Sequence, residues 1–316
     1  MKMRAPGRPG PVVVLPGKED CVAGMSQGRE TRELGYFPLV LLLLGSGLFL
    51  AACRAHDALS PRVSLHYLGH SAFVLTFGDT LRVLTDYGES NAYGLDSPVY
   101  GLGPLQPLVV TLSHRHADHA GGPLPEGAKA FVLSGEEILA TDSASRAGPT
   151  PRFAGDLRIT PIPTFEGSLA EGPDNTSFLF EYRGLKILHL GDCQGLMVAL
   201  ASERRDEIIR RIRSLYPDHY DAVLLPIGFI YDILGAAADL ATYIDCDVII
   251  PMHFWSPGDR ERFLDLMEGR EDAQGRPFVP VAVSGSVLKL PDKGGEPGPV
   301  RVIGLVPGPW REPGAG

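Results

Sequence analysis

The chain of 316 residues has little cysteine and no excess of positive charge. Its four cysteines are too few to predict a disulfide framework. With 29 Lys and Arg against 38 Asp and Glu, the formal net charge is -9. This balance argues against a nucleic-acid groove, because phosphate backbones are held mainly by clustered basic side chains. The hydrophobic content of 44% is that of an ordinary globular protein.

The sequence also lacks an apolar run of the roughly 20 residues that a membrane-spanning helix needs. Its longest such run, "PLVLLLLGSGLFLAA" at 38–52, has the length of a secretory signal and ends in small residues, as a cleavage site does. "LAAC" resembles a bacterial lipobox, in which the cysteine, here Cys53, is lipidated and becomes the first residue of the mature protein. An uncleaved signal anchor is the alternative. Met1 and Met25 are both candidate translation starts.

We therefore expect three segments. Residues 1–52 form an N-terminal extension with a lipoprotein-type signal peptide, 53–62 form a tether, and 63–307 form one domain. The protein is expected in the bacterial cell envelope, anchored to a membrane outside the cytoplasm through Cys53.

Short β-rich runs separated by turn residues dominate the expected domain, and helical periodicity enters after Gly195. Expected strands lie at 63–69, 72–78, 80–86, 108–112, 130–134, 157–162, 177–182, 186–191, 221–227, 247–254, 280–285, 287–290 and 300–305. Expected helices lie at 135–141, 208–215, 233–244 and 260–267. Strands with interspersed helices and no linker predict an α/β domain in which two packed sheets have helices outside.

The loop "SHRHADHAGG" at 113–122 follows the expected strand at 108–112 directly. His114 and His116 are one residue apart, so both imidazoles can turn to the same side, and Asp118 and His119 follow one turn later. Imidazole and carboxylate are ligands that zinc, iron and manganese share. Such a cluster at the end of a strand is typical of a metal or catalytic site rather than of packing.

This pattern, His-x-His-x-Asp-His, resembles the signature of the metallo-β-lactamase fold hydrolases. The similarity extends over nearly the whole expected domain and is greatest to the branch of ascorbate-6-phosphate lactonase-like and related zinc-dependent hydrolases. It implies a four-layer αββα sandwich of two mixed β-sheets with outer helices. It also implies that Asp192 in "ILHLGD" bridges two metals and that His253 in "VIIPMH" is the last histidine ligand.

The resemblance divides the ligands between two metal positions. The first position would have His114, His116 and the shared Asp192, and the second would have Asp118, His119, Asp192 and His253. It further implies that Asp86 supports the metal loop through hydrogen bonds, and that His70 in "GHSAF" belongs to the same surroundings.

The family usually supplies a third histidine to the first metal from the stretch that here reads "PIPTFEGS". We align Phe165 with that histidine, which predicts a weakened first site. Glu166 is then either a compensating oxygen ligand or an exposed loop carboxylate. Asn175 and Thr176 are expected to open a strand as turn residues rather than as substrate contacts, and His189 is expected to be structural.

The resulting hypothesis is a metal-dependent hydrolase. A metal-bound hydroxide would cleave an ester, lactone, amide or phosphodiester bond of a small-molecule or lipid-type substrate. Asp118 would orient the nucleophile and relay its proton. One or two zinc ions are expected, with manganese or iron as alternatives. Two other functions stay open at this point: a metal-binding module without turnover, motivated by Phe165, and a mononuclear iron oxidoreductase.

The lipobox interpretation yields a direct test. In a bacterial host, Cys53→Ala should block lipidation and so release or mislocalise the protein, because the cysteine sulfur carries the lipid. Membrane fractionation with metabolic lipid labelling measures this. A variant that stays membrane-bound at the normal processed size would contradict the interpretation.

Overall fold

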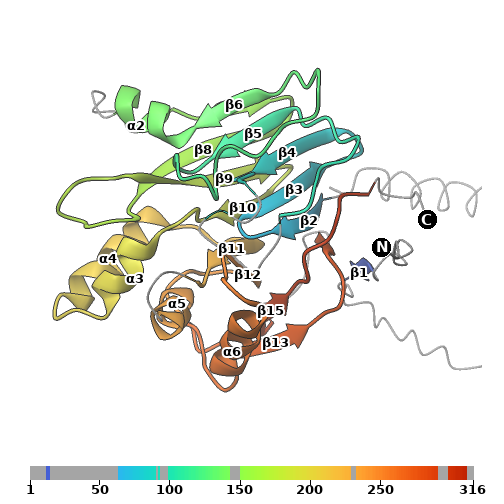
Figure 1. Cartoon of the computed structure of the whole chain (residues 1–316). Coiled ribbons are helices and arrows are strands. Elements are labelled where there is room, and N and C mark those ends of the chain that lie inside the picture. Colours follow the sequence, from blue (N-terminus) through green and yellow to red (C-terminus); the bar gives the residue numbers. More distant parts are fainter. Residues whose placement is uncertain are drawn as a thin grey trace, which may run out of the picture.

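The computed structural model describes residues 63–89, 92, 99–142, 150–228, 233–290 and 298–311, together with the backbone of 12–14. These residues form two mixed β-sheets that pack together, with few helices (Figure 1). The predicted α/β fold with two mixed sheets is thereby confirmed. The apolar run 38–52, Cys53 and the expected tether lie outside the described residues. Among the described residues, no helix is both long and apolar enough to span a membrane.

The first sheet has seven strands in the order β1-β14-β2-β3-β4-β5-β6. Strands β2 (Val63–Gly69), β3 (Ala72–Phe77) and β4 (Leu81–Thr85) are antiparallel neighbours. Strands β5 (Val109–Leu112) and β6 (Phe131–Ser134) continue the sheet in parallel with β4. On the other side, β14 (Val287–Leu290) pairs antiparallel with β2, and β1 (Val12–Val14) pairs parallel with β14.

The second sheet has eight strands in the order β13-β15-β12-β11-β10-β9-β8-β7. Strands β7 (Arg152–Ala154), β8 (Leu157–Thr164), β9 (Asn175–Tyr182) and β10 (Leu185–His189) are antiparallel neighbours. The next neighbours are parallel: β10 with β11 (Ala222–Pro226), β11 with β12 (Val248–Met252), β12 with β15 (Val300–Gly304), and β15 with β13 (Phe278–Ala282). Parallel strands end at the same edge of a sheet, which matters for the site below.

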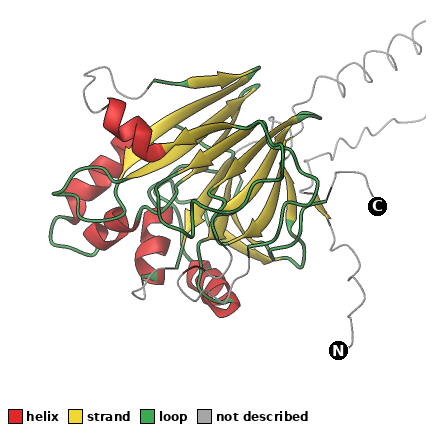
Figure 2. Ribbon diagram, turned by 45° about the horizontal axis from the view of Figure 1, so that its top comes forward, coloured by secondary structure: helices red, strands yellow, loops and turns green. Residues whose placement is uncertain are grey.

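Helices α5 (Leu234–Ala241) and α6 (Pro257–Met267) pack on the second sheet, α3 (Gln194–Leu200) packs against α5, and α4 (Arg205–Leu215) packs against α3 (Figure 1). In Figure 2 the helices, drawn in red, gather along one side of the strands. A short helix, α2 (Gly135–Asp142), follows β6. On the outer face of the first sheet, a small apolar cluster includes Val74, Leu84, Leu102 and Trp310. In the described residues, loop and C-terminal segments therefore contribute to the cover of that face.

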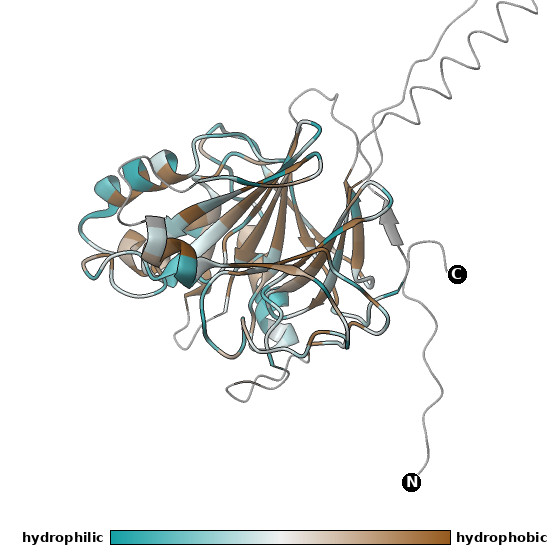
Figure 3. Cartoon of the chain, turned by 90° about the horizontal axis from the view of Figure 1, so that it is seen from above, coloured by the Kyte–Doolittle hydropathy of each residue, from teal (hydrophilic) through white to brown (hydrophobic). Residues whose placement is uncertain are grey.

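The main core lies between the sheets and beneath the helices, where the strands are brown and the outer helical faces carry teal (Figure 3). Tyr67 and Phe73 stack with their ring centres 4.7 Å apart. Strands β11 and β12 are buried along their whole length, which explains why their sequences are continuous apolar runs rather than alternating ones. Cys193 and Cys246 are both buried and free, so they do not pair.

One charged cluster at the surface gives the fold a pH dependence. His219 has its Nδ1 3.1 Å from an oxygen of Asp245 and its Nε2 3.4 Å from an oxygen of Asp247. Hydrogen bonding to Asp247 raises the pKa of His219 to about 9, although partial burial opposes this shift. Because the folded-state pKa lies above the ordinary 6.5, the stabilisation is fully present below about pH 6.5. It is lost as the pH rises through about 9.

We therefore expect His219→Gln to lower the free energy of unfolding by about 0.5 to 1 kcal/mol at pH 6, since solvent weakens such partly exposed pairs. At pH 10 the difference between the variant and the wild type should nearly vanish. Urea unfolding at both pH values measures it. A difference that is the same at the two pH values would exclude this role.

Candidate metal centre

The histidine loop leaves the carboxyl end of β5 and turns back at once. The backbone N–H groups of His119 and Ala120 both donate to the carbonyl of His116, at 2.9 and 2.8 Å, so Asp118 and His119 return toward His114. The neighbouring chain packs tightly on this turn: a Cβ on Gly88 would lie 2.0 Å from the backbone of Asp118. Only glycine fits at position 88, and the backbone there packs directly against the histidine loop.

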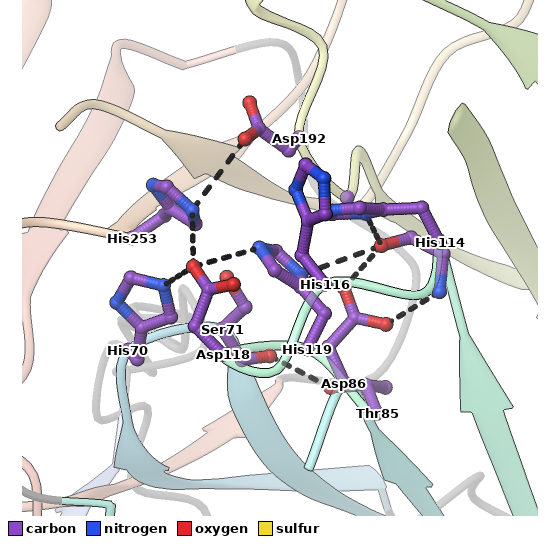
Figure 4. Close-up of polar contacts among 12 residues, drawn as sticks. His70, Ser71, Thr85, Asp86, His114, His116, Asp118, His119, Asp192 and His253 are labelled. Atoms are coloured by element: carbon purple, nitrogen blue, oxygen red, sulfur yellow. Dashed lines mark hydrogen bonds and ion pairs between the residues drawn. The ribbon is translucent and has the colours of Figure 1, made fainter. Parts of the chain in front are cut away.

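Two other segments deliver ligand-type residues to the same place. Asp192 follows β10 and His253 follows β12, so both lie at the carboxyl edge of the parallel part of the second sheet. His70 lies in the turn between β2 and β3. Figure 4 shows these side chains pointing toward one another. The residues that the sequence singled out are thus brought together from four segments.

One oxygen of Asp118 lies at the centre of the cluster. Its Oδ2 is 2.9 Å from Nε2 of His70, 3.5 Å from Nε2 of His253 and 3.6 Å from Nε2 of His119 (Figure 4). Nε2 of His253 is also 3.6 Å from Oδ2 of Asp192. Atoms at these separations surround a common space, as ligands of one ion do when each lies about 2 Å from it.

Asp86, at the end of β4, anchors the loop from beneath. Its carboxylate accepts hydrogen bonds from the backbone N–H and the hydroxyl of Ser113, both at 2.7 Å, and from Nδ1 of His119 at 2.8 Å. Asp86 is fully buried and has a φ of +37°, and His70 and His253 also have positive φ values. Positive φ values are uncommon outside glycine, although Asp and His adopt them more often than most residues, and they cluster at functional sites.

The residues present fit a metal ion. Several buried atoms in the cluster have no hydrogen-bond partner among the described residues: Nε2 of His114, Nε2 of His119, Oδ1 of Asp118 and Oδ1 of Asp192. Buried polar atoms are ordinarily paired, so converging orphans need an explanation. The ligand-type side chains form three overlapping groups, and within each group the ligand atoms lie within 4.8 Å of one another. Together the groups comprise His70, His114, His116, Asp118, His119, Glu166, Asp192 and His253.

The protonation states suit the same chemistry. Burial lowers the pKa of His114 to about 2 and that of His119 well below its ordinary value, so both imidazoles are neutral, the form that ligates metals. Burial favours the acid form of Asp118, but hydrogen bonds with His253 and His70 outweigh it and hold its pKa well below the usual range. Burial raises the pKa of Asp192 to about 8, a shift that a nearby cation reverses.

Comparison with known proteins agrees with this geometry. The model of the "Beta-lactamase superfamily domain" matches residues 64–253, more than half of the chain. The chain belongs to the metallo-β-lactamase superfamily. It is 28% identical over 244 residues to a UPF0173 metal-dependent hydrolase of Methanosphaerula palustris, covering 72% of this chain and 99% of the relative.

A UPF0173 metal-dependent hydrolase of Natranaerobius thermophilus is 27% identical over 217 residues, or 64% of this chain and 89% of that protein. Among solved structures, Igni18, a metallo hydrolase of Ignicoccus hospitalis, superposes with a TM-score of 0.52 at 21% identity. That match covers 73% of this chain and all of Igni18. At this identity the structural likeness supports the fold alone.

The structure places the side chains of Phe165 and Glu166 in different surroundings. Phe165 is 2% exposed and lies in the core, with the guanidinium carbon of Arg211 4.3 Å from its ring centre. The next residue, Glu166, faces the metal centre instead: its Oε1 is 3.0 Å from Nδ1 of His116 and its Oε2 is 3.5 Å from Nε2 of His114. Phe165 and Glu166 follow the end of β8 at Thr164, and the chain there turns Phe165 into the core and Glu166 toward His114 and His116. The alternative of an exposed loop carboxylate is wrong, because the Glu166 side chain is only 21% exposed.

Asn175 has a supporting role that its sequence position did not predict. It opens β9, as expected, but it is fully buried rather than a turn residue. Its side-chain oxygen accepts a hydrogen bond from the backbone N–H of Asp192 at 3.2 Å, and its amide donates to the carbonyl of Leu190 at 3.0 Å. Asn175 thereby holds the segment that carries Asp192. The sequence signal for this role is an amide side chain at the head of the apolar run "NTSFLFEY".

His189 lies behind the centre. It is fully buried, its Nε2 contacts the carbonyl of Ser71 at 3.2 Å, and its Nδ1 accepts from the N–H of Gly191 at 3.2 Å. Both ring nitrogens are therefore engaged by the backbone, as expected for a structural histidine.

The burial of Phe165 in the core predicts that a histidine at this position would not bind the metal. Phe165→His should place a polar ring in the core, lower the free energy of unfolding by about 2 to 4 kcal/mol and add no metal ligand. Urea unfolding and metal analysis of the purified variant measure the two effects. Unchanged stability together with an additional bound metal would show that Phe165 faces the metal centre after all.

Proposed function

We propose that this protein is a hydrolase that uses two adjacent metal ions to activate water. The observation that carries the proposal is the convergence, at the superfamily's signature positions, of buried imidazole and carboxylate atoms that have no hydrogen-bond partner among the described residues. His114, His116 and Asp192 would hold the first ion, and Asp118, His119, Asp192 and His253 would hold the second, which we expect to be zinc. The names of the related hydrolases support the same class of reaction.

When bound, the metal lowers the pKa of a coordinated water from 15.7 to about 7 and thus supplies a hydroxide nucleophile at neutral pH. Asp118 has the geometry to orient that nucleophile. Its Oδ2 is held by Nε2 of His70, whereas its Oδ1 is buried without a hydrogen-bond partner among the described residues. The carboxylate can accept the proton of the attacking water and return it to the leaving group.

The bond cleaved would be an ester, lactone, amide or phosphodiester bond of a small-molecule or lipid-type substrate. The arrangement needs no serine or cysteine nucleophile, and Cys193, next to Asp192, is fully buried in the core. The motive for a metal-binding module without turnover was an incomplete first site. The position of Glu166 beside His114 and His116 supports a complete first site instead.

The place of the enzyme in the cell is a separate proposal. The apolar run 38–52 and "LAAC" support a membrane-tethered lipoprotein of the bacterial cell envelope. Such a tether would hold the catalytic domain outside the cytoplasm, within reach of a lipid-type substrate.

The two aspartates should have separable effects. Asp192→Ala should lower the content of both metals, because a bridging carboxylate contacts each, whereas Asp118→Ala should chiefly empty the second position and reduce hydrolysis at least about 100-fold. Metal analysis after dialysis and a panel of nitrophenyl esters, lactones and phosphodiesters measure the two outcomes.

The matched control is Asp156→Asn, since Asp156 is a surface carboxylate that pairs with Arg183. This variant should keep the metal content and the hydrolysis rate of the wild type. Equal metal content in the wild type, Asp192→Ala and Asp118→Ala would contradict the assignment.

A further inference from the structure

The loop after β8 brings a carboxylate to the first metal position. The ligand atoms of His114, His116 and Glu166 lie within 4.8 Å of one another. Ligands that lie about 2 Å from a shared ion are themselves about 3 to 4 Å apart. The separations of Glu166 from His116 and His114, 3.0 and 3.5 Å, are of that size.

Backbone hydrogen bonds, within the loop and from α3, hold the segment that carries Glu166. Asp174 accepts hydrogen bonds from the backbone N–H of Glu166 at 2.7 Å and of Gly167 at 3.0 Å. The N–H of Gly195 donates to the carbonyl of Phe165 at 2.9 Å. A Cβ on Gly167 would lie 2.8 Å from Asp174, and one on Gly195 would lie 2.1 Å from the carbonyl oxygen of Gly167. The loop therefore has little freedom to move Glu166 away.

We propose that Glu166 is the third protein ligand at the first metal position and that it shifts the metal preference of this position toward manganese(II) and iron(II). The proposal rests on the proposed function, because it takes the metal-dependent site as given. With Glu166, the position has two imidazoles and one carboxylate of its own, in addition to the shared Asp192. A third histidine would make it a three-imidazole site; both ligand sets bind zinc, so the carboxylate acts on the ratio of the affinities.

The physical reason is the hardness of the ligand. Carboxylate oxygens suit manganese, and two histidines with one carboxylate are the usual set for non-heme iron(II). Affinities still rise from manganese through iron toward zinc at most nitrogen and oxygen sites, so zinc remains the tighter ion in absolute terms. What the carboxylate changes is the ratio of the affinities.

A purely structural role for Glu166 makes a different prediction. If Glu166 only paired with His116 at 3.0 Å, a glutamine could keep a hydrogen bond of similar geometry and metal affinity would not change. A ligand role requires the negative oxygen itself. Glu166→Gln separates these roles, and Glu166→His reverses the proposed metal preference.

The test uses the full chain, depleted of metal and titrated with manganese(II) and with zinc(II), alone and in competition. Calorimetry gives the affinities and electron paramagnetic resonance reports bound manganese. Glu166→Gln should weaken manganese binding at one of two positions at least about tenfold. Glu166→His should raise the zinc-to-manganese affinity ratio at that position by about tenfold or more, since 1.4 kcal/mol of ligand preference is a factor of 10.

Glu136→Gln is the matched control. Glu136 is exposed and pairs with Arg115 of the histidine loop at 3.2 Å, so it is a nearby carboxylate outside the ligand groups. Circular dichroism verifies that each variant is folded. If Glu166→His does not fold, the comparison of Glu166→Gln with the wild type still decides whether Glu166 is a ligand.

Unchanged manganese affinity in Glu166→Gln overturns the ligand assignment. An unchanged zinc-to-manganese ratio in a folded Glu166→His overturns the preference. Neither measurement depends on turnover: a protein that hydrolyses nothing but shows the shifted ratio refutes the hydrolase proposal alone. A hydrolase with an unshifted ratio refutes this inference alone.

Discussion

The hydrogen bonds of Asp86 are the constraint on which the rest of the metal centre depends. This fully buried carboxylate, with a φ of +37°, ties Ser113 and His119 to the end of β4. A carboxylate on Nδ1 of His119 fixes the ring with its proton on that nitrogen, and Nε2 is then directed to the metal. Because the carboxylate is sealed from water, it strongly favours this single arrangement over others.

The same principle recurs at the other ligands. Nδ1 of His253 donates to the carbonyl of Gly228 at 2.6 Å, which directs Nε2 toward Asp118 and Asp192. Asn175 orients Asp192 in the same way, because its side-chain oxygen accepts a hydrogen bond from the backbone N–H of Asp192. Each ligand at a strand end is thus fixed by a partner from a neighbouring segment. The two sheets supply the distances between the ligands and the buried hydrogen bonds supply their orientations.

The sequence predicted much of this arrangement because its strongest signals are local. Strand β2 is found where "VSLHYLG" was expected. The apolar composition of the runs that form β11 and β12 was enough to predict buried strands there. Asp192 and His253 could be placed only through a resemblance, since no local pattern brings together residues that are 61 positions apart in the chain (253 − 192). Whether Phe165 or Glu166 faces the histidines depends on how the chain turns after β8 ends at Thr164. The local sequence does not fix that turn. Asn175 needed knowledge of its burial.

The difference in burial between the two halves of the centre explains where the superfamily pattern can change. His70, Asp118, His119 and His253 are all buried, so an added carboxylate among them would carry a large desolvation penalty. The half that contains Glu166 is open to water: the His116 side chain is 48% exposed and that of Glu166 21%. There, solvent and the imidazole of His116 offset the cost of the charge. An exchange of histidine for glutamate is therefore tolerated at the edge of the site, where it alters the choice of metal, while the buried half keeps the geometry that Asp118 requires.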